Sequence, residues 1–247
     1  MSTVGEQNMS KYVDSVEKTV YNHLKPYGFK KYGRTLQRIV SDDIPQVINF
    51  QISAGFNKFC VNLGIRVHEC AARLYDEPQE IKKYYREYEC CIRTRLGAKI
   101  NRDGTWFCAI DDAEKTAELI IRELDKTVIP MFDAMSSREG ILANRRDYPF
   151  IDGNEWMILL DECMIYLHMG DVTLAKAKFD EYYALALEEY ESRMQQGRTV
   201  FLKKGERVVF GNQDITAEKT GYVTLYDTNR SHLDYLDKLA VRLGFCN

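Results

Sequence analysis

Residues 47–67 read VINFQISAGFNKFCVNLGIRV, and they decide the first half of the fold. Apolar and polar side chains alternate along two runs that are separated by a short turn. Successive residues of a strand point to opposite faces of a sheet, so this alternation predicts two antiparallel strands with one apolar and one solvated face. The predicted apolar face contains Ile48, Phe50 and Ile52 from the first strand and Phe59, Val61, Leu63, Ile65 and Val67 from the second.

The flanking sequence predicts more strands and three helices. We expect strands at residues 34–40, 88–96 and 105–110, which gives an antiparallel sheet of about five strands. Asp42 and Pro45 are expected to form the turn after the first of these. Helices are expected at residues 10–25, where apolar residues recur three and four apart, at 69–87 around Tyr84 and Tyr85, and after residue 112.

The third predicted helix has recognisable signals at both ends. Asp111 and Asp112 are expected to cap its start, and Pro130 is expected to end or kink it. Its predicted apolar stripe consists of Leu119, Ile120, Leu124 and Val128. The helix–strand–helix order predicts an α+β domain over residues 1–148.

Residues 149–247 are predicted to be mainly helical, with short strands after Gly197 and a final helix from Ser231. Gly170 and Asp171 are expected to separate two helices. Tyr166, Ala175 and Phe179 have the spacing of a tetratricopeptide repeat. One such unit cannot bury its own faces, so a single helical hairpin is favoured.

Composition excludes several classes of protein. The 247 residues are 45% hydrophobic and 29% charged, with a net charge of −3, which is typical of a globular chain and lacks the basic excess of a nucleic-acid binder. No signal peptide or membrane span is expected. The seven cysteines suggest a reduced, cytoplasmic protein.

No sequence motif for chemistry is found. The cysteine and histidine spacings do not fit a metal site, and Cys90 and Cys91 would point to opposite faces of the predicted strand 88–96. Nucleotide-binding glycine loops and a nucleophile elbow are also missing, so no cofactor is expected. An enzyme would need a Cys, His and carboxylate site that assembles only in three dimensions.

The runs LKPYGFKKYGRTLQRI and VINFQISAGFNKFCVNLGI carry a family resemblance. Their Pro26, Gly28 and Phe29, the pair Phe50–Gln51, and Asn62 with Gly64 resemble the bacterial "domain of unknown function 4304" family over roughly residues 10–145. The resemblance implies an opening helix that ends in a Pro–Gly–Phe turn and continues into strands. No activity is implied, and no catalytic residues can be transferred.

The polar face of the sheet is the first candidate binding surface. Its candidate residues are Asn49, Gln51, Asn62, Arg66, Arg93 and Arg95. Amides could pair with a peptide, and arginines suit carboxylates or phosphates. The alternative interpretation is that an antiparallel sheet simply needs a solvated side.

A predicted helix of the second half offers another candidate surface. It contains Asp180, Glu181, Glu188, Glu189 and Glu191, which could attract a basic partner or form an ordinary exposed face.

We therefore expect a bacterial, cytoplasmic α+β protein that acts as a non-enzymatic protein-binding module, for example an antitoxin-like immunity protein that masks a toxin. The enzyme assembled in three dimensions is the alternative. A protein partner is expected, and the 16 tyrosines are compatible with a homodimer.

Overall fold

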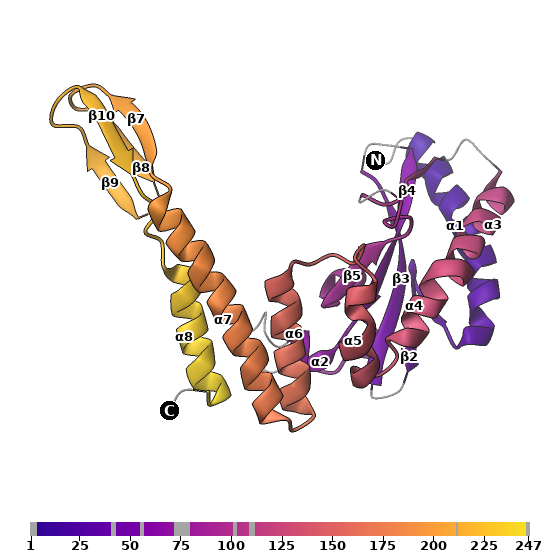
Figure 1. Ribbon diagram of the computed structural model, residues 1–247. Helices are drawn as coiled ribbons and strands as arrows, with labels where there is room; N and C mark the ends of the chain where they lie inside the picture. Colours follow the sequence, from indigo (N-terminus) through magenta and orange to yellow (C-terminus); the bar gives the residue numbers. More distant parts are fainter. Residues whose placement is uncertain are drawn as a thin grey trace. The chain divides into compact units, whose positions relative to one another are not determined.

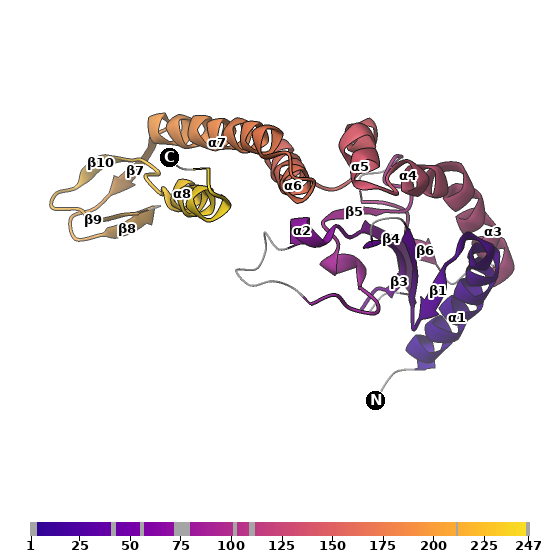
Figure 2. The same ribbon diagram turned by 90° about the horizontal axis from the view of Figure 1, so that it is seen from below.

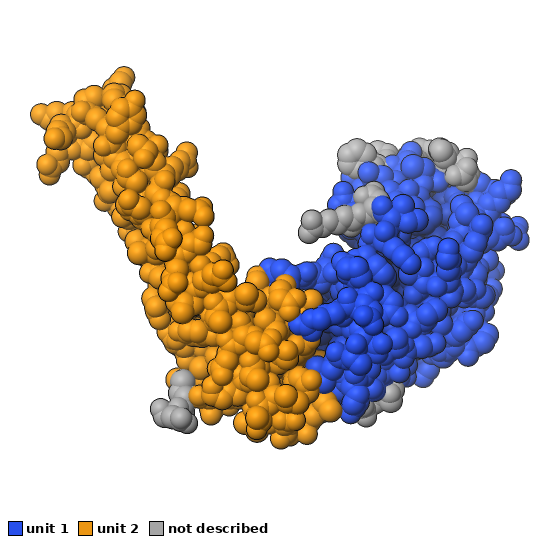
Figure 3. Space-filling view, viewed as in Figure 1, with its two compact units in different colours: residues 1–154 blue, residues 155–247 orange. Residues whose placement is uncertain are grey.

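The computed structural model describes residues 4–40, 43–54, 57–71, 80–100, 103–108, 112–210 and 212–245. The chain divides into two compact units, residues 1–154 and residues 155–247 (Figure 3). None of the helices within these described ranges is both long enough and apolar enough to cross a membrane.

The first unit contains the predicted antiparallel sheet. Strands β1 to β5 lie side by side in sequence order, and β6 pairs with β4 (Figure 1). The strands are β1 Lys30–Tyr32, β2 Thr35–Val40, β3 Ile44–Ile52, β4 Lys58–Ile65, β5 Ile92–Arg95 and β6 Phe107–Cys108. The α+β fold is confirmed. The short strand β1 was not predicted, and Pro45 lies inside β3 rather than in the preceding turn.

The register of β3 and β4 confirms the predicted apolar face. Ile48 pairs with Leu63, Phe50 with Val61 and Ile52 with Phe59. Helices α1 (Val4–Leu24), α3 (Ala113–Glu123) and α4 (Ile129–Ala134) cover one side of the sheet (Figure 2). Helix α2 (His68–Ala71) and residues 80–91 lie on the other side.

Helix α1 ends where the sequence predicted. The 3₁₀ turn η1, Lys25–Tyr27, contains Pro26 and is closed by Gly28 in the left-handed region at φ 89°. A left-handed residue favours glycine because a side chain there would be strained. The next residue, Phe29, is buried and stacks against Phe132 of α4, so the turn directs the chain into the core.

The third helix is more irregular than predicted. A π-helical segment, η5 (Leu124–Val128), joins α3 to α4, and Pro130 lies in the first turn of α4. Asp112 caps α3 by accepting from the Glu114 N–H, whereas Asp111 lies outside the described residues. Leu119 is 52% exposed, so its assignment to the apolar stripe was wrong.

The segment before β5 differs most from the prediction. Only α2 and the 3₁₀ turn η4 (Glu87–Glu89) are helical among the described residues of 68–91. Tyr84 and Tyr85 therefore lie in non-helical chain, and residues 72–79 are outside the described ranges. We call residues 80–89 the strap. Helices α5 (Arg138–Asn144) and η6 (Arg145–Asp147) complete the unit.

The second unit consists of three helices and a ribbon made of two short two-stranded sheets. Its helices are α6 Glu155–His168, α7 Val172–Gln195 and α8 Ser231–Leu243. Gly170 and Asp171 separate α6 from α7 as predicted, with Asp171 capping α7. The ribbon is formed by β7 (Arg198–Leu202) with β10 (Gly221–Leu225) and by β8 (Arg207–Phe210) with β9 (Gln213–Thr216). The helices share a core that includes Leu159, Cys163, Phe179 and Leu236.

Candidate functional site

One row of polar side chains crosses four strands of the first unit. Thr35 of β2 pairs with Asn49 of β3, Asn49 with Asn62 of β4, and Asn62 with Arg95 of β5. Directly paired residues of antiparallel strands point to the same face, so these four side chains form a continuous row on the polar face. Gln51 extends the polar surface from the next position of the same face on β3.

Hydrogen bonds connect the members of this row. Arg95 Nε donates to Asn62 Oδ1 at 3.2 Å, and Asn62 Nδ2 donates to Gln51 Oε1 at 2.8 Å. At the other end, Asn49 Nδ2 donates to Thr35 Oγ1 at 3.0 Å. Asn62 is buried at the centre of this network. The network therefore holds the amides in fixed orientations. Among the described residues, no acceptor contacts the side-chain N–H group of exposed Gln51, which can donate to a ligand.

The strap covers the other half of the polar face. The Tyr85 N–H donates to the side-chain oxygen of Gln37 at 2.8 Å, and the amide of Gln37 donates to the Lys83 carbonyl at 3.3 Å. A Cβ added to Gly64 would lie 2.7 Å from Cys90 Sγ, just beyond the strap. Glycine at position 64 thus lets this segment approach the sheet closely.

Arg66 belongs to this covered half. Its side chain is buried, its guanidinium lies 4.4 Å from the centre of the Tyr85 ring, and it donates to the Glu89 carbonyl. Arg66 was expected on the open polar surface. Strand alternation correctly places Arg66 on the polar face, but the strap covers that part of the face. Through its contacts with Tyr85 and Glu89, Arg66 holds the strap in place.

A cleft of about 310 Å³ opens beside the polar row. It is lined by Gln51, Asn62, Leu63, Glu87, Arg93, Thr94, Arg95, Asp103 and Asp152, and we call it the amide cleft. Four of the six predicted site residues meet there: Gln51, Asn62, Arg93 and Arg95. Among the described residues, no ion-pair or hydrogen-bond partner contacts the side chains of Arg93, Glu87 or Asp152. The cleft therefore presents charges of both signs to solvent.

Arg95 is held rigidly at the edge of this cleft. Its guanidinium lies 5.0 Å from the Trp106 ring centre, and its Nη1 donates to the Asp103 carbonyl at 2.8 Å. Gly104, at φ 72°, lies so close to the Arg95 stem that an added Cβ would be 2.5 Å away. Trp106 and the 103–104 turn were not predicted as part of the site because they come from a separate segment of the chain.

A second cleft of about 710 Å³ lies on the other side of Gln51 and Glu87. Its lining includes three tyrosines from β1 and the strap, together with Thr35, Asn49, Gln51 and Glu87; we call it the tyrosine cleft. Tyr32 and Tyr84 stack with ring centres 5.1 Å apart and planes 11° apart. Tyr88 is the third tyrosine. The sequence did not indicate this cluster, since Tyr84 was placed in the predicted helix 69–87, Tyr88 in the predicted strand 88–96, and Tyr32 in no element.

Two thiols of the first unit, those of Cys60 and Cys90, favour the neutral form. Burial raises the pKa of Cys60, and this outweighs the opposing effect of Arg95. Burial likewise raises the pKa of Cys90 well above its usual value, with further contributions from Cys91 and nearby acids. The Cys60 thiol donates weakly to Asn62 Oδ1 at 3.6 Å. These cysteines behave as protonated donors rather than as reactive thiolates.

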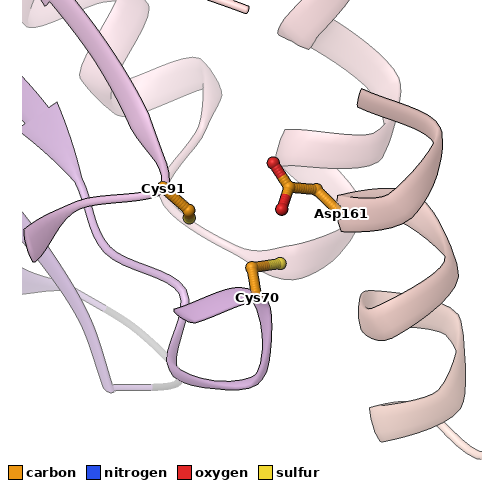
Figure 4. Close-up of side chains that lie close together, drawn as sticks. All are labelled: Cys70, Cys91 and Asp161. Carbon is orange, nitrogen blue, oxygen red and sulfur yellow. The ribbon is translucent and has the colours of Figure 1, made fainter. Parts of the chain in front are cut away.

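The cysteine geometry also differs from the expected strand geometry. Cys90 and Cys91 precede β5, so the argument from opposite strand faces does not apply. Cys70 of α2 and Cys91 have sulfur atoms within 4.8 Å of each other (Figure 4). Two sulfur ligands are fewer than a structural zinc site requires. Asp161, also labelled there, belongs to α6 of the second unit.

The acidic residues of α7 are exposed but partly paired. Asp180 accepts from Lys176 at 2.7 Å, Glu181 from Lys178 at 3.1 Å, and Glu189 lies 3.9 Å from Arg193. These are pairs three or four residues apart on one helix, which is a common stabilising arrangement. They lower the charge available to a basic partner.

Residues 20–134 match the family model described as domain of unknown function (DUF4304). The matched segment contains the whole sheet from β1 to β6. It therefore also contains the strand residues that line the two clefts. Comparison with curated proteins and with solved structures returned no match. The DUF4304 description assigns no activity, so the site is interpreted from its own geometry.

Proposed function

We propose that the first unit is a non-enzymatic protein-binding module and that it binds its partner through the open half of the polar face. The supporting observation is the network Arg95–Asn62–Gln51. It lies beside Arg93, Glu87 and Asp152, whose side chains have no partner in the part of the chain that the structure describes. Fixed donors and acceptors lose little conformational freedom on binding, so they favour a specific polar interface. Unpaired charges of both signs favour a partner surface that supplies their complements.

The surrounding residues are of the kinds that dominate protein interfaces. Tyr84 and Tyr88 on the strap are 44% and 56% exposed, and Arg86 donates to the Tyr88 hydroxyl at 3.1 Å. Tyrosine and arginine are enriched among residues that carry binding energy. Together with the amide cleft they give one surface with aromatic anchors and a polar rim.

The alternative of an enzyme with a Cys, His and carboxylate site receives less support. Cys60 is the cysteine that bonds to the polar row, and its raised pKa disfavours the thiolate that a nucleophile requires. His23 pairs with Asp125 at 2.8 Å, and Asp125 lies in the helical layer on the apolar side of the sheet. Its imidazole is therefore engaged away from the polar row.

An antitoxin-like immunity protein is one concrete form of this proposal. Such a protein needs a rigid surface that masks its target and no chemistry of its own. The amide cleft, held by side-chain hydrogen bonds, would supply that surface. This form is proposed on analogy and makes the same prediction as any other protein-binding role.

A charge reversal on the open surface tests the proposal. Arg93→Glu should abolish capture of at least one protein from a native lysate of the source cells, because the partner's carboxylate would then face a like charge. Arg122→Glu is the matched control, since Arg122 is exposed on α3 and the change in charge is identical. Quantitative mass spectrometry of the captured proteins compares the two variants with the wild type.

Both variants should retain the thermal unfolding midpoint of the wild type, because both side chains are exposed. A partner retained by Arg122→Glu and lost from Arg93→Glu would support the open polar face. Identical capture by wild type and Arg93→Glu would show that this face binds no partner and would contradict the proposal.

A further inference from the structure

The tyrosine cleft combines parallel aromatic rings with unused hydrogen-bond donors. Tyr32 and Tyr84 stack almost parallel, and Tyr88 adds a third exposed ring. Within the described residues, the hydroxyls of Tyr32 and Tyr84 and the side-chain N–H of Gln51 have no acceptor. The cleft thus offers flat apolar surface with donors beside it.

These properties fit one kind of backbone better than others. A polyproline II helix forms no internal hydrogen bonds, so its carbonyl groups remain available as acceptors. Its proline rings form ridges that pack against aromatic side chains. An amphipathic helix would instead need a continuous apolar groove and would bring its carbonyl groups already paired. A cleft with tyrosine rings and free donors matches the polyproline II helix.

The charge at the junction of the two clefts adds a second requirement. Glu87 lines both clefts, is partly exposed, and its carboxylate has no partner among the described residues. Two arginines also line the tyrosine cleft, but Arg34 pairs with Asp14 at 2.8 Å and Arg86 donates to the Tyr88 hydroxyl at 3.1 Å. A basic side chain next to the prolines would pair with the Glu87 carboxylate. Because Glu87 lies at the junction of the two clefts, this ion pair would also set the direction in which the bound segment runs.

We propose that the tyrosine cleft binds a proline-rich segment of a protein partner in the polyproline II conformation, with a neighbouring arginine or lysine directed at Glu87. This inference rests on the proposed protein-binding function and specifies the segment that the partner contributes. It adds a ligand class and a set of contact residues, Tyr32, Tyr84, Tyr88, Gln51 and Glu87, that the family description does not contain.

Two peptides of equal charge test the proposal. The probe is a capped, fluorescently labelled peptide of ten prolines with an arginine at each end, and the control replaces the prolines by alternating glycine and serine. Fluorescence anisotropy of the full chain should give a dissociation constant below about 1 mM for the proline peptide and binding about tenfold weaker for the control.

Substitutions then locate the binding. Tyr88→Ala should weaken binding of the proline peptide about tenfold, as should Tyr84→Ala, because each removes a ring that contacts proline. Glu87→Gln should weaken binding of the arginine-ended proline peptide, because the carboxylate that pairs with a terminal arginine is then missing. Tyr222→Ala is the matched control, since Tyr222 is 77% exposed on the ribbon of the second unit and should leave affinity unchanged.

Tyr84 stacks on Tyr32, so its replacement could lower stability; Tyr88 and Glu87 make no such contact and keep the test decisive. No binding of the proline peptide at about 1 mM, equal binding of the glycine–serine peptide, or unchanged affinity of Tyr88→Ala would each overturn the proposal. If the peptides fail while Arg93→Glu still loses a partner, the protein-binding function stands and only the proline-rich ligand is wrong. If both experiments fail, both proposals are wrong.

Discussion

The covered and open halves of the polar sheet face contain the same residue types, amides and arginines, but these side chains have different partners. In the covered half, Gln37 and Arg66 bond to the backbone of the strap. In the open half, Asn62 accepts from Arg95 and donates to Gln51. One half therefore bonds most of its polar groups to the strap, although Arg66 Nε has no hydrogen-bond partner among the described residues. The other half retains donors and charges that face solvent.

This difference shows how one surface can serve both stability and recognition. A buried polar group that loses its partner costs free energy, so side chains of the covered half must be matched by the strap. An exposed side chain can exchange a partner for water at little cost. Changes in the covered half should therefore act on stability, and equivalent changes in the open half should act on binding.

The largest expected effect comes from reversing the charge of the buried arginine. Arg66→Glu should lower the free energy of unfolding by about 3 kcal/mol, because a carboxylate would lie buried against the Tyr85 ring and the Glu89 carbonyl. Arg93 lies on the same face and pairs with Gly64, two residues before Arg66. Arg93→Glu should change the free energy of unfolding by less than about 0.5 kcal/mol. Urea unfolding followed by circular dichroism measures both. Equal effects would remove the distinction between the two halves.

A smaller effect is expected where the backbone of β4 meets the end of the strap. Gly64→Ala should cost about 1–3 kcal/mol, because the new Cβ would lie 2.7 Å from Cys90 Sγ and 2.9 Å from Cys90 Cβ. Cys90→Ala removes the sulfur, so the double variant should lose less stability than the sum of the two single variants. Strict additivity in this cycle, measured by urea unfolding, would show that the two residues do not press on each other.

The sequence was sufficient for features that depend on local pattern. Alternation in residues 47–67 predicted the faces of β3 and β4, and Gly170 with Asp171 located the break between two helices. These signals need only neighbouring residues and a buried core. The polar row followed from the same alternation.

The strap could not be predicted because its conformation is fixed by distant contacts. The hydrogen bonds between Gln37 and residues 83 and 85 join positions 46 and 48 apart in the sequence. The tyrosines of this segment suggested helix, but tertiary hydrogen bonds outweighed that weak preference. As a result, the covered position of Arg66 and the tyrosines of the tyrosine cleft were missed, whereas Asn49 and Gln51 of that cleft were predicted.

The smallest predicted effect concerns the pH dependence of the strap. Partial burial alone would raise the pKa of Glu89, but hydrogen bonds from the Arg86 N–H and the Lys82 ammonium outweigh it and hold this pKa below the ordinary value of 4.5. The ionised carboxylate therefore stabilises the folded state above pH 4.5, and this contribution is lost as the pH falls through the lowered pKa.

Replacing this carboxylate separates its contribution from the rest of the fold. Glu89→Gln should lower the free energy of unfolding by about 0.5–1 kcal/mol at pH 7, through loss of the charged cap and the exposed ion pair, and by close to nothing at about pH 3. Glu80→Gln, an exposed change on the same strap, should have no effect at either pH. Urea unfolding at the two pH values measures all three proteins. A deficit in Glu89→Gln that persists unchanged at the lower pH would mean that the strap is held by shape and neutral hydrogen bonds alone, and that charge contributes to the open half of the face only.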